Sequence, residues 1–259
     1  MNFLHLFEKK SLIGAHRGDR ANFPENTLSA MKGAQCRCDF IEIDTQLSKD
    51  GVAIIMHDAT LERTTNITQL KEFAHKKPFR VCDFTLKELK GLDYGTWFNG
   101  EFEPLLTLNQ ALKFVKQNKL YLNLEIKDMH NNFQDTQVIQ TIMHEIEQTG
   151  THKQLLISSF YHQYLKACKP LPTAALVDTK HPNDLVNYLK ELRVEAYHFN
   201  KKLVCEETIT HLRANGFFIN IYTLNDPNKI KELFRMGVNG VFTDDLDKIA
   251  SKRYNDANI

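Results

Sequence analysis

The chain has 259 residues, a length that fits one large domain or two small ones, and its 42% hydrophobic and 25% charged residues are ordinary for a globular protein. Thirty-three basic and 32 acidic side chains leave a formal net charge of +1, which argues against a nucleic-acid partner. The sequence contains no signal-peptide core and no run approaching the roughly 18 apolar residues of an integral membrane segment. Because the five cysteines are odd in number and irregularly spaced, we expect reduced thiols and a cytoplasmic protein.

Short apolar runs alternate with amphipathic stretches along most of the chain. The first two strand-like runs are residues 11–16 and 40–46, with a helical pattern from about 25 to 36 between them. Six more strand-like runs follow, at 121–127, 155–160, 173–177, 195–200, 217–223 and 240–244. Helical patterns lie near 108–117, 134–149, 161–168, 184–193, 205–215 and 227–236, and a last one begins at about 245.

This alternation predicts the fold class. Strict βα order predicts a parallel sheet, and eight units predict closure into a (β/α)8 TIM barrel of the α/β class. We expect residues 1–259 to form a single barrel domain. An open doubly wound sheet is the alternative, but no Gly-rich dinucleotide-binding fingerprint follows any of the strands.

The segment from about 47 to 107 interrupts the alternation. Ser48-Lys49-Asp50-Gly51 is a strong turn signal, so residues 52–57 are expected to return from the second strand as a hairpin. The remainder resembles a loop, with a short helical pattern at 86–92. We interpret the segment as a small insertion after strand two that sits over the barrel mouth.

Three carboxylates lie on two of the predicted strands. Glu42 and Asp44 are two positions apart and therefore point to the same side, the barrel interior, and Glu125 lies near the end of the next barrel strand. Three converging carboxylates repel one another unless a cation holds them, and all-oxygen ligation suits Mg²⁺, Ca²⁺ or Mn²⁺ better than zinc. The alternative is ordinary ion pairing, for instance of Glu125 with Lys127 or Arg17.

Two histidines and two cations accompany these carboxylates. His16 ends the first strand and His57 ends the hairpin return. Because histidine titrates near neutral pH, a pair beside a bound cation indicates an acid and a base. Arg17 and Lys127 add fixed positive charge, which phosphoryl transfer needs to offset the charge on the phosphate oxygens.

An ordered set of short motifs gives the chain a family resemblance. The first half contains His16-Arg17-Gly18, Pro24-Glu25-Asn26-Thr27, Glu42-x-Asp44, Lys49-Asp50-Gly51, His57-Asp58 and Leu61-x-Arg63-Thr64. The second half contains Glu125-Ile-Lys127, Ser158-Ser159-Phe160, Tyr222-Thr223-Leu224-Asn225 and the stretch from Gly237 to Asp244. In this order, from about residue 11 to 245, the chain resembles the glycerophosphodiester phosphodiesterase family, whose fold is a β/α barrel with an insertion after strand two.

The resemblance implies a role for each matching residue. His16 and His57 would be the general acid and base, and one divalent cation, Mg²⁺ or Ca²⁺ with Mn²⁺ as a further candidate, would be held by Glu42, Asp44 and Glu125. The phosphate would be contacted by Arg17 and Lys127. Tyr222 stands where the family usually has tryptophan, and it keeps an aromatic wall for the substrate while adding a hydroxyl.

The implied reaction is hydrolysis of a small glycerophosphodiester to glycerol 3-phosphate and an alcohol. One alternative is lysophospholipase D-type hydrolysis of lysophospholipids at the same site. An apolar channel for their acyl chains would then be lined by aromatic residues of the insertion, which otherwise form its own core: Tyr94, Trp97, Phe98 and Phe102. A second alternative is a phospholigand-binding protein with an inactive site. Such a protein would be expected to lack a site histidine or carboxylate, and this sequence retains all of them.

Overall fold

Eight parallel strands close into a barrel in the computed structural model, which describes residues 2–9 and 11–253. The strands run in the order β1-β9-β8-β7-β6-β5-β4-β2, and a further pairing of β1 with β2 closes the ring. Their bounds are Leu12–His16 (β1), Phe40–Leu47 (β2), Leu122–Ile126 (β4), Leu155–Ser159 (β5), Thr173–Val177 (β6), Ala196–Asn200 (β7), Phe218–Tyr222 (β8) and Gly240–Thr243 (β9). The predicted (β/α)8 barrel is confirmed.

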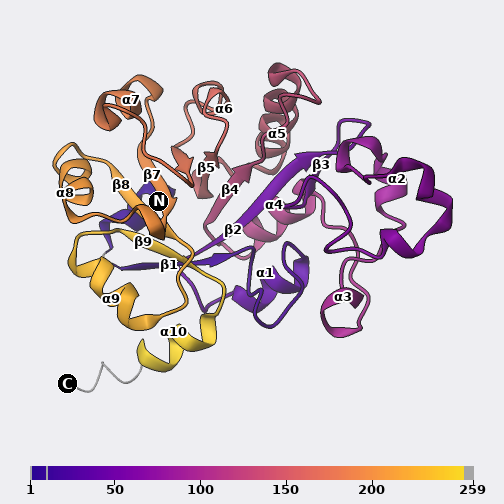
Figure 1. Cartoon of the computed structure of the whole chain (residues 1–259), viewed down its shortest axis with the longest axis horizontal. Helices are drawn as coiled ribbons and strands as arrows, with labels where there is room; N and C mark the ends of the chain where they lie inside the picture. Colours follow the sequence, from indigo (N-terminus) through magenta and orange to yellow (C-terminus); the bar gives the residue numbers. More distant parts are fainter. Residues whose placement is uncertain (1, 10, 254–259) are drawn as a thin grey trace.

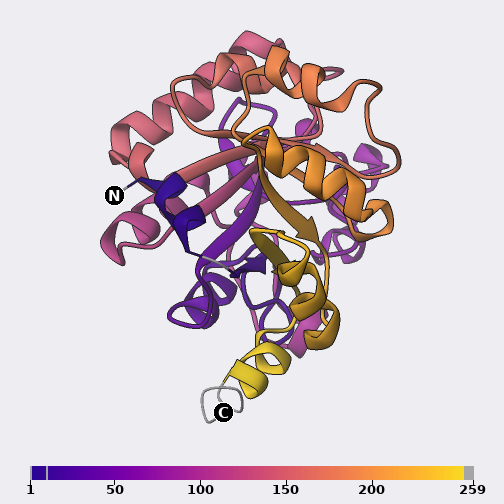
Figure 2. The ribbon, with the colours of Figure 1, turned by 90° about the vertical axis from the view of Figure 1, so that its left-hand side faces the viewer.

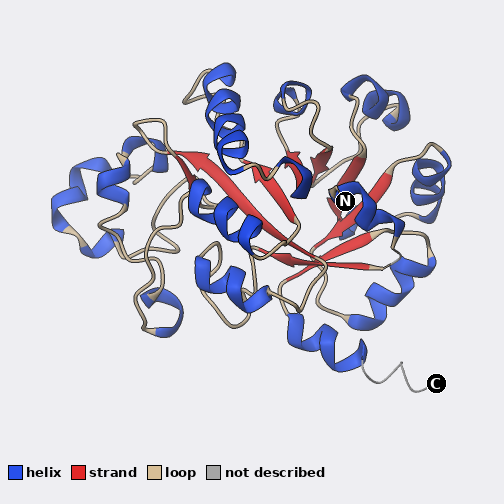
Figure 3. Ribbon diagram, turned by 180° about the vertical axis from the view of Figure 1, so that it is seen from behind, coloured by secondary structure: helices blue, strands red, loops and turns tan. Residues whose placement is uncertain are grey.

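Helices surround the strands on the outside of the barrel (Figures 1 and 3). Their bounds are Leu28–Ala34 (α1), Leu108–Gln117 (α4), Asp135–Thr149 (α5), Gln163–Ala167 (α6), Leu185–Leu192 (α7), Glu206–Ala214 (α8), Pro227–Arg235 (α9) and Leu246–Arg253 (α10). The first helix begins later than the pattern from residue 25 predicts. Asn26 has a left-handed backbone (φ 59°), and Thr27 then caps the helix by accepting a hydrogen bond from the Ala30 amide. None of the described helices is long and apolar enough to cross a membrane.

The hairpin after β2 forms, with a shorter return strand than expected. Gly51 takes the left-handed conformation (φ 76°) that the turn requires, and β3 (Ala53–Ile55) pairs antiparallel with the end of β2. Beyond β3 the chain contains short helices, among them α2 (Leu86–Leu89) and α3 (Thr96–Asn99), which lie beside the barrel (Figure 1). This insertion has its own apolar core, made of Ile54, Met56, Leu61, Ile67, Phe79, Val81, Phe84, Leu89, Leu92, Tyr94 and Leu105.

The aromatic residues assigned to that core behave differently from one another. Tyr94 is buried in it, whereas Trp97 is 39% exposed and Phe102 is 66% exposed. Phe98 is half-buried and packs edge-on against Trp97. The expectation of one aromatic core is therefore wrong for Trp97 and Phe102, which α3 and the loop after it hold on the surface, and Phe98 packs on Trp97 and not in that core.

A short N-terminal helix closes the end of the barrel opposite the carboxyl ends of the strands (Figure 2). This 3₁₀ helix, η1 (Phe3–Glu8), buries Phe3 and Phe7 against residues at the beginnings of strands. The Phe7 ring stacks on Phe218 at 4.3 Å, and Phe3 meets the edge of Phe40 at 5.6 Å. The opposite end of the barrel, where the strands finish, is therefore the open one.

Candidate active site

The three predicted carboxylates lie together inside the open end of the barrel. Glu42 and Asp44 point inward from β2, and Asp44 is directly opposite Glu125 of β4 in the strand register. One carboxylate oxygen from each residue lies within 4.8 Å of the others, and all three residues are at most 9% exposed. Carboxylate oxygens at this spacing are the donor set that Mg²⁺, Ca²⁺ and Mn²⁺ prefer.

Two positively charged side chains, Lys127 and Arg17, neutralise part of this negative charge. Lys127 Nζ lies 2.6 Å from Glu125 Oε1 and 3.4 Å from Asp44 Oδ1. The Arg17 amide donates to Glu42 Oε2 at 2.9 Å, and Arg17 Nε lies 3.5 Å from Asp44 Oδ2. The ion pair between Glu125 and Lys127, which the sequence offered as an alternative to metal binding, is therefore present.

Two cations do not fully compensate three buried carboxylates, and the pKa values reflect this. Burial, and then repulsion from Asp44 and Glu125, hold the pKa of Glu42 well above its ordinary value. Burial and Asp44 raise the pKa of Glu125 to about 7 in spite of Lys127. Although burial opposes it, the pKa of Asp44 is lowered by Lys127 and Arg17. This shortage of positive charge fits a site for a divalent cation.

The turn that follows β1 places Arg17 beside the acid cluster, which we define as Glu42, Asp44 and Glu125. Arg17 itself has φ 57°, and Gly18 has φ 82°. A Cβ at Gly18 would lie 2.7 Å from the backbone of Ala30, so only glycine fits between this turn and α1. The turn directs the Arg17 amide at Glu42 and its guanidinium toward Asp44.

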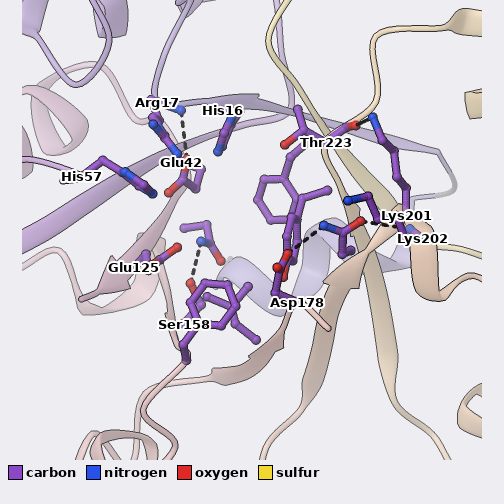
Figure 4. A pocket seen from close by; sticks show the side chains of 16 residues that line it. His16, Arg17, Glu42, His57, Glu125, Ser158, Asp178, Lys201, Lys202 and Thr223 are labelled. Atoms are coloured by element: carbon purple, nitrogen blue, oxygen red, sulfur yellow. Dashed lines mark hydrogen bonds between the residues drawn. The ribbon is translucent and has the colours of Figure 1, made fainter. Parts of the chain in front are cut away.

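The two histidines lie on either side of Glu42 (Figure 4). His16 Nδ1 lies 2.7 Å from Asp244 Oδ1, and His57 Nδ1 lies 2.6 Å from Asp58 Oδ1. Burial is the main cause that lowers the pKa of both histidines, so both rings are mainly neutral at pH 7. A carboxylate at Nδ1 leaves Nε2 of each ring for proton exchange with a bound molecule.

A side chain of β2 fixes the loop that carries His57. Gln46 Nε2 donates to the carbonyl of Met56 at 2.9 Å and to the carbonyl of Asp58 at 2.7 Å. These two bonds bracket His57 on both sides. The hairpin return is thereby tied to the same strand that supplies Glu42 and Asp44.

Glu25 joins the first loop to the insertion through three arginines. Its carboxylate lies 2.8 Å from Arg17 Nη1, 2.8 Å from Arg20 Nη2 and 2.6 Å from Arg63 Nη2. Although burial opposes it, the hydrogen bond from Arg63 and the charges of Arg17 and Arg20 lower the pKa of Glu25 to about 2.

The same arginines reach the carboxylate partners of both histidines. Arg63 Nε donates to Asp58 Oδ2 at 2.6 Å, and Arg20 Nη1 lies 3.3 Å from Asp244 Oδ1. Sequence reasoning gave no role to Asp58, Asp244 or Arg20. Asp58 was detectable as the neighbour of His57, whereas the other contacts join segments that only folding brings together.

A cavity of about 530 Å³ opens beside the acid cluster. One wall contains His16, Arg17, Glu42, His57 and Glu125. The opposite wall contains Asp178, Lys201, Lys202 and Thr223 (Figure 4), and Asn200, which also lines the cavity, donates to Asp178 at 2.7 Å. Asp44 and Lys127 are not part of the cavity wall.

Tyr222 lines this cavity, and its hydroxyl hydrogen is already used in a hydrogen bond within the protein. The hydroxyl donates to the Val177 carbonyl at 2.5 Å, so the side chain contributes its ring and not a free donor. Trp97, Phe98 and Phe102 do not line the cavity. The apolar channel that lysophospholipids would need is therefore not formed by these residues of the insertion.

The fold and the site define a class, the (β/α)8-barrel enzymes whose working groups lie at the carboxyl ends of the strands. The family model described as "Glycerophosphoryl diester phosphodiesterase family" matches residues 16–248. The chain therefore belongs to the glycerophosphoryl diester phosphodiesterase family of enzymes.

Individual relatives agree with this membership. A glycerophosphodiester phosphodiesterase of Bacillus altitudinis is 33% identical over 252 residues, which cover 93% of this chain and 97% of that protein. The enzyme of the same name from Caldanaerobacter subterraneus is 31% identical and covers 93% and 96% of the two chains. An Oleispira antarctica phosphodiesterase, solved with its product sn-glycerol-3-phosphate, superposes with a TM-score of 0.83 at 27% identity, covering 96% of this chain and 99% of that one.

Proposed function

We propose that this enzyme hydrolyses glycerophosphodiesters to glycerol 3-phosphate and an alcohol, with one divalent cation and two histidines. The observation that carries the proposal is the arrangement of two neutral histidines on either side of Glu42, each with Nδ1 on a carboxylate. Family membership and the product complex of the Oleispira antarctica relative support the choice of substrate.

Glu42, Asp44 and Glu125 would hold the cation, which is Mg²⁺ or Ca²⁺, with Mn²⁺ as a further candidate. When bound, the cation supplies positive charge that stabilises the negative phosphate oxygens as the reaction proceeds. Arg17 lines the cavity and Lys127 lies against Asp44 and Glu125, and we assign these two fixed positive charges to the phosphate.

The two histidines divide the proton transfers between them. One, entering as the neutral imidazole, accepts at Nε2 the proton of the attacking hydroxyl group, and the other, entering as the imidazolium, donates its Nε2 proton to the leaving alkoxide. Asp244 and Asp58 hold the rings in the required orientation and stabilise whichever ring becomes charged. Tyr222 forms an aromatic wall for the substrate through its ring.

Release of glycerol 3-phosphate from glycerophosphocholine tests the proposal. We expect release by the purified protein, its loss in EDTA, and its recovery when Mg²⁺ or Ca²⁺ is added in excess of the chelator. Lysophosphatidylcholine in a parallel choline-release assay should be a much poorer substrate. The proposal would be refuted if the protein hydrolysed no glycerophosphodiester with any of the three cations. Full activity in EDTA would also refute it.

A further inference from the structure

A pair of buried polar side chains, Asn123 and Ser158, lines the cavity beside the acid cluster. Asn123 lies two positions before Glu125 on β4 and is opposite Glu42 in the strand register. Ser158 of β5 is opposite Glu125. Both residues line the cavity, although Asn123 is only 1% exposed and Ser158 is fully buried. Ser158 is seen near Glu125 in Figure 4.

The hydrogen bonds of this pair are incomplete. Asn123 Nδ2 donates to Ser158 Oγ at 2.9 Å. Asn123 Oδ1 has no hydrogen-bond partner within residues 2–9 and 11–253, even though it is shielded from solvent. The Ser158 hydroxyl hydrogen likewise has no acceptor in the described part of the chain. Because a buried carbonyl oxygen without a partner is costly, a ligand group that satisfies it is favoured.

We infer that Asn123 and Ser158 form a hydroxyl-binding subsite for the glycerol half of the substrate, an inference that rests on the proposed function. A hydroxyl group both donates and accepts, so it can donate to Asn123 Oδ1 and accept from Ser158 Oγ. A hydrogen atom at the same carbon leaves both protein groups unsatisfied. The subsite therefore selects a polyol phosphate over a deoxygenated one.

The position of the pair explains why it binds the glycerol half and not the leaving alcohol. Asn123 lies beside Glu42 and Ser158 lies beside Glu125 on neighbouring strands, next to the place where the cation and the phosphate are proposed to bind. The leaving alcohol then extends toward the opposite wall of the cavity, where the exposed Lys201 and Lys202 lie (Figure 4). The part of the substrate common to all glycerophosphodiesters thus occupies the buried half of the cavity.

A second buried pair inside the barrel provides a matched control. Asn220 Nδ2 lies 3.0 Å from His198 Nε2, and Asn220 Oδ1 also has no partner in the described part of the chain. Both residues are fully buried, but neither lines the cavity. Asn220→Ala therefore disturbs a comparable interior amide without touching the proposed subsite.

The test is the affinity of the Mg²⁺- or Ca²⁺-loaded enzyme for phosphate monoesters, measured by calorimetry. The probes are glycerol 3-phosphate, 3-hydroxypropyl phosphate, which lacks the C2 hydroxyl, and 2-hydroxypropyl phosphate, which lacks the C1 hydroxyl. We expect the wild type to bind glycerol 3-phosphate about 10- to 100-fold more tightly than at least one of the deoxy compounds. Because the probes are not hydrolysed, the result does not depend on which group attacks phosphorus.

Asn123→Ala and Ser158→Ala should each reduce this preference to within about threefold, by weakening glycerol 3-phosphate binding and leaving the deoxy compound unchanged. Asn220→Ala should keep the wild-type preference. The two subsite variants serve as independent tests if one of them fails to fold. Equal affinity of the wild type for all three probes would overturn the inference, and so would an undiminished preference in the subsite variants.

The failure of the subsite and the failure of the proposed function are distinguishable. A wild type that releases glycerol 3-phosphate from glycerophosphocholine but binds the three probes equally retains the function and lacks the subsite. A wild type that neither hydrolyses glycerophosphodiesters nor binds glycerol 3-phosphate refutes both.

Discussion

His16 and Asp244 are 228 positions apart in the chain and 2.7 Å apart in space, joined through Nδ1 of the imidazole and Oδ1 of the carboxylate. The contact arises because β1 and β9 are neighbours in the closed barrel, so the loops that follow them meet. The contact orients the His16 ring through Nδ1, which leaves Nε2 for the proton transfer that we propose.

Replacing Asp244 should therefore impair turnover more than binding. We expect Asp244→Asn to lower kcat about 10- to 100-fold with little change in KM, because His16 loses its orienting partner. Asp244 raises the pKa of His16 against the larger lowering effect of burial. Without that carboxylate the His16 pKa falls further, so the limb of the pH–rate profile that reports His16 should move to lower pH.

The neighbouring Asp245 provides a control for this measurement. Its carboxylate lies 2.8 Å from Lys248 and makes no contact with His16. Asp245→Asn should leave both kcat and the pH profile close to those of the wild type. An Asp244→Asn enzyme with wild-type kcat and an unshifted profile would show that the contact does not position His16.

Cation binding should weaken as the pH falls. A cation ligand must be deprotonated, and burial with repulsion from Asp44 raises the pKa of Glu125 to about 7 in the metal-free protein. Below this pH Glu125 of the metal-free protein binds a proton that the cation has to displace, whereas above it the Glu125 carboxylate is already deprotonated. We expect the affinity for Mg²⁺ or Ca²⁺ to be several-fold to about 10-fold lower at pH 6 than at pH 8.

Calorimetry in buffers of different ionisation enthalpy checks this prediction, because it also counts the protons that are released. Release at pH 6 and little release at pH 8 is the expected pattern. Equal affinities at the two pH values, with no protons released, would mean that the carboxylates carry no exchangeable proton before the cation binds.

The N-terminal helix should contribute to stability and not to catalysis. Phe7 is 5% exposed and stacks on Phe218 at the closed end of the barrel, so Phe7→Ala leaves a cavity in a packed cluster. We expect a loss of about 3–5 kcal/mol in the free energy of unfolding, measured by urea denaturation, with kcat unchanged for the folded protein.

Phe102→Ala is the matched substitution on the surface. Phe102 is 66% exposed, so its removal should change the free energy of unfolding by less than about 0.5 kcal/mol. Equal effects of the two substitutions would contradict the assignment of η1 as part of the barrel core.

The barrel could be predicted from the sequence because strands buried on both faces read as continuous apolar runs, and these runs alternate with helical patterns on both sides of the insertion. The acid cluster was accessible for a related reason. Residues two apart on a strand share a face, so Glu42 and Asp44 had to point the same way.

Other features depend on packing that local patterns do not encode. The apolar residues of η1 give no sign that Phe3 and Phe7 close a barrel, because their partners come from strands throughout the chain. The surface positions of Trp97 and Phe102 follow from an irregular segment whose course has no periodicity to read. The contact between His16 and Asp244 likewise exists only after closure of the sheet.

The most direct test of the two-histidine proposal is the turnover of glycerophosphocholine by His16→Ala and His57→Ala enzymes at saturating Mg²⁺ or Ca²⁺, with folding verified by circular dichroism. Each proton transfer is typically worth about 10²- to 10⁴-fold, so kcat for either variant should fall by at least about 100-fold while the circular dichroism spectrum stays unchanged. Turnover within a few-fold of the wild type in either folded variant would contradict the proposed roles of the two histidines.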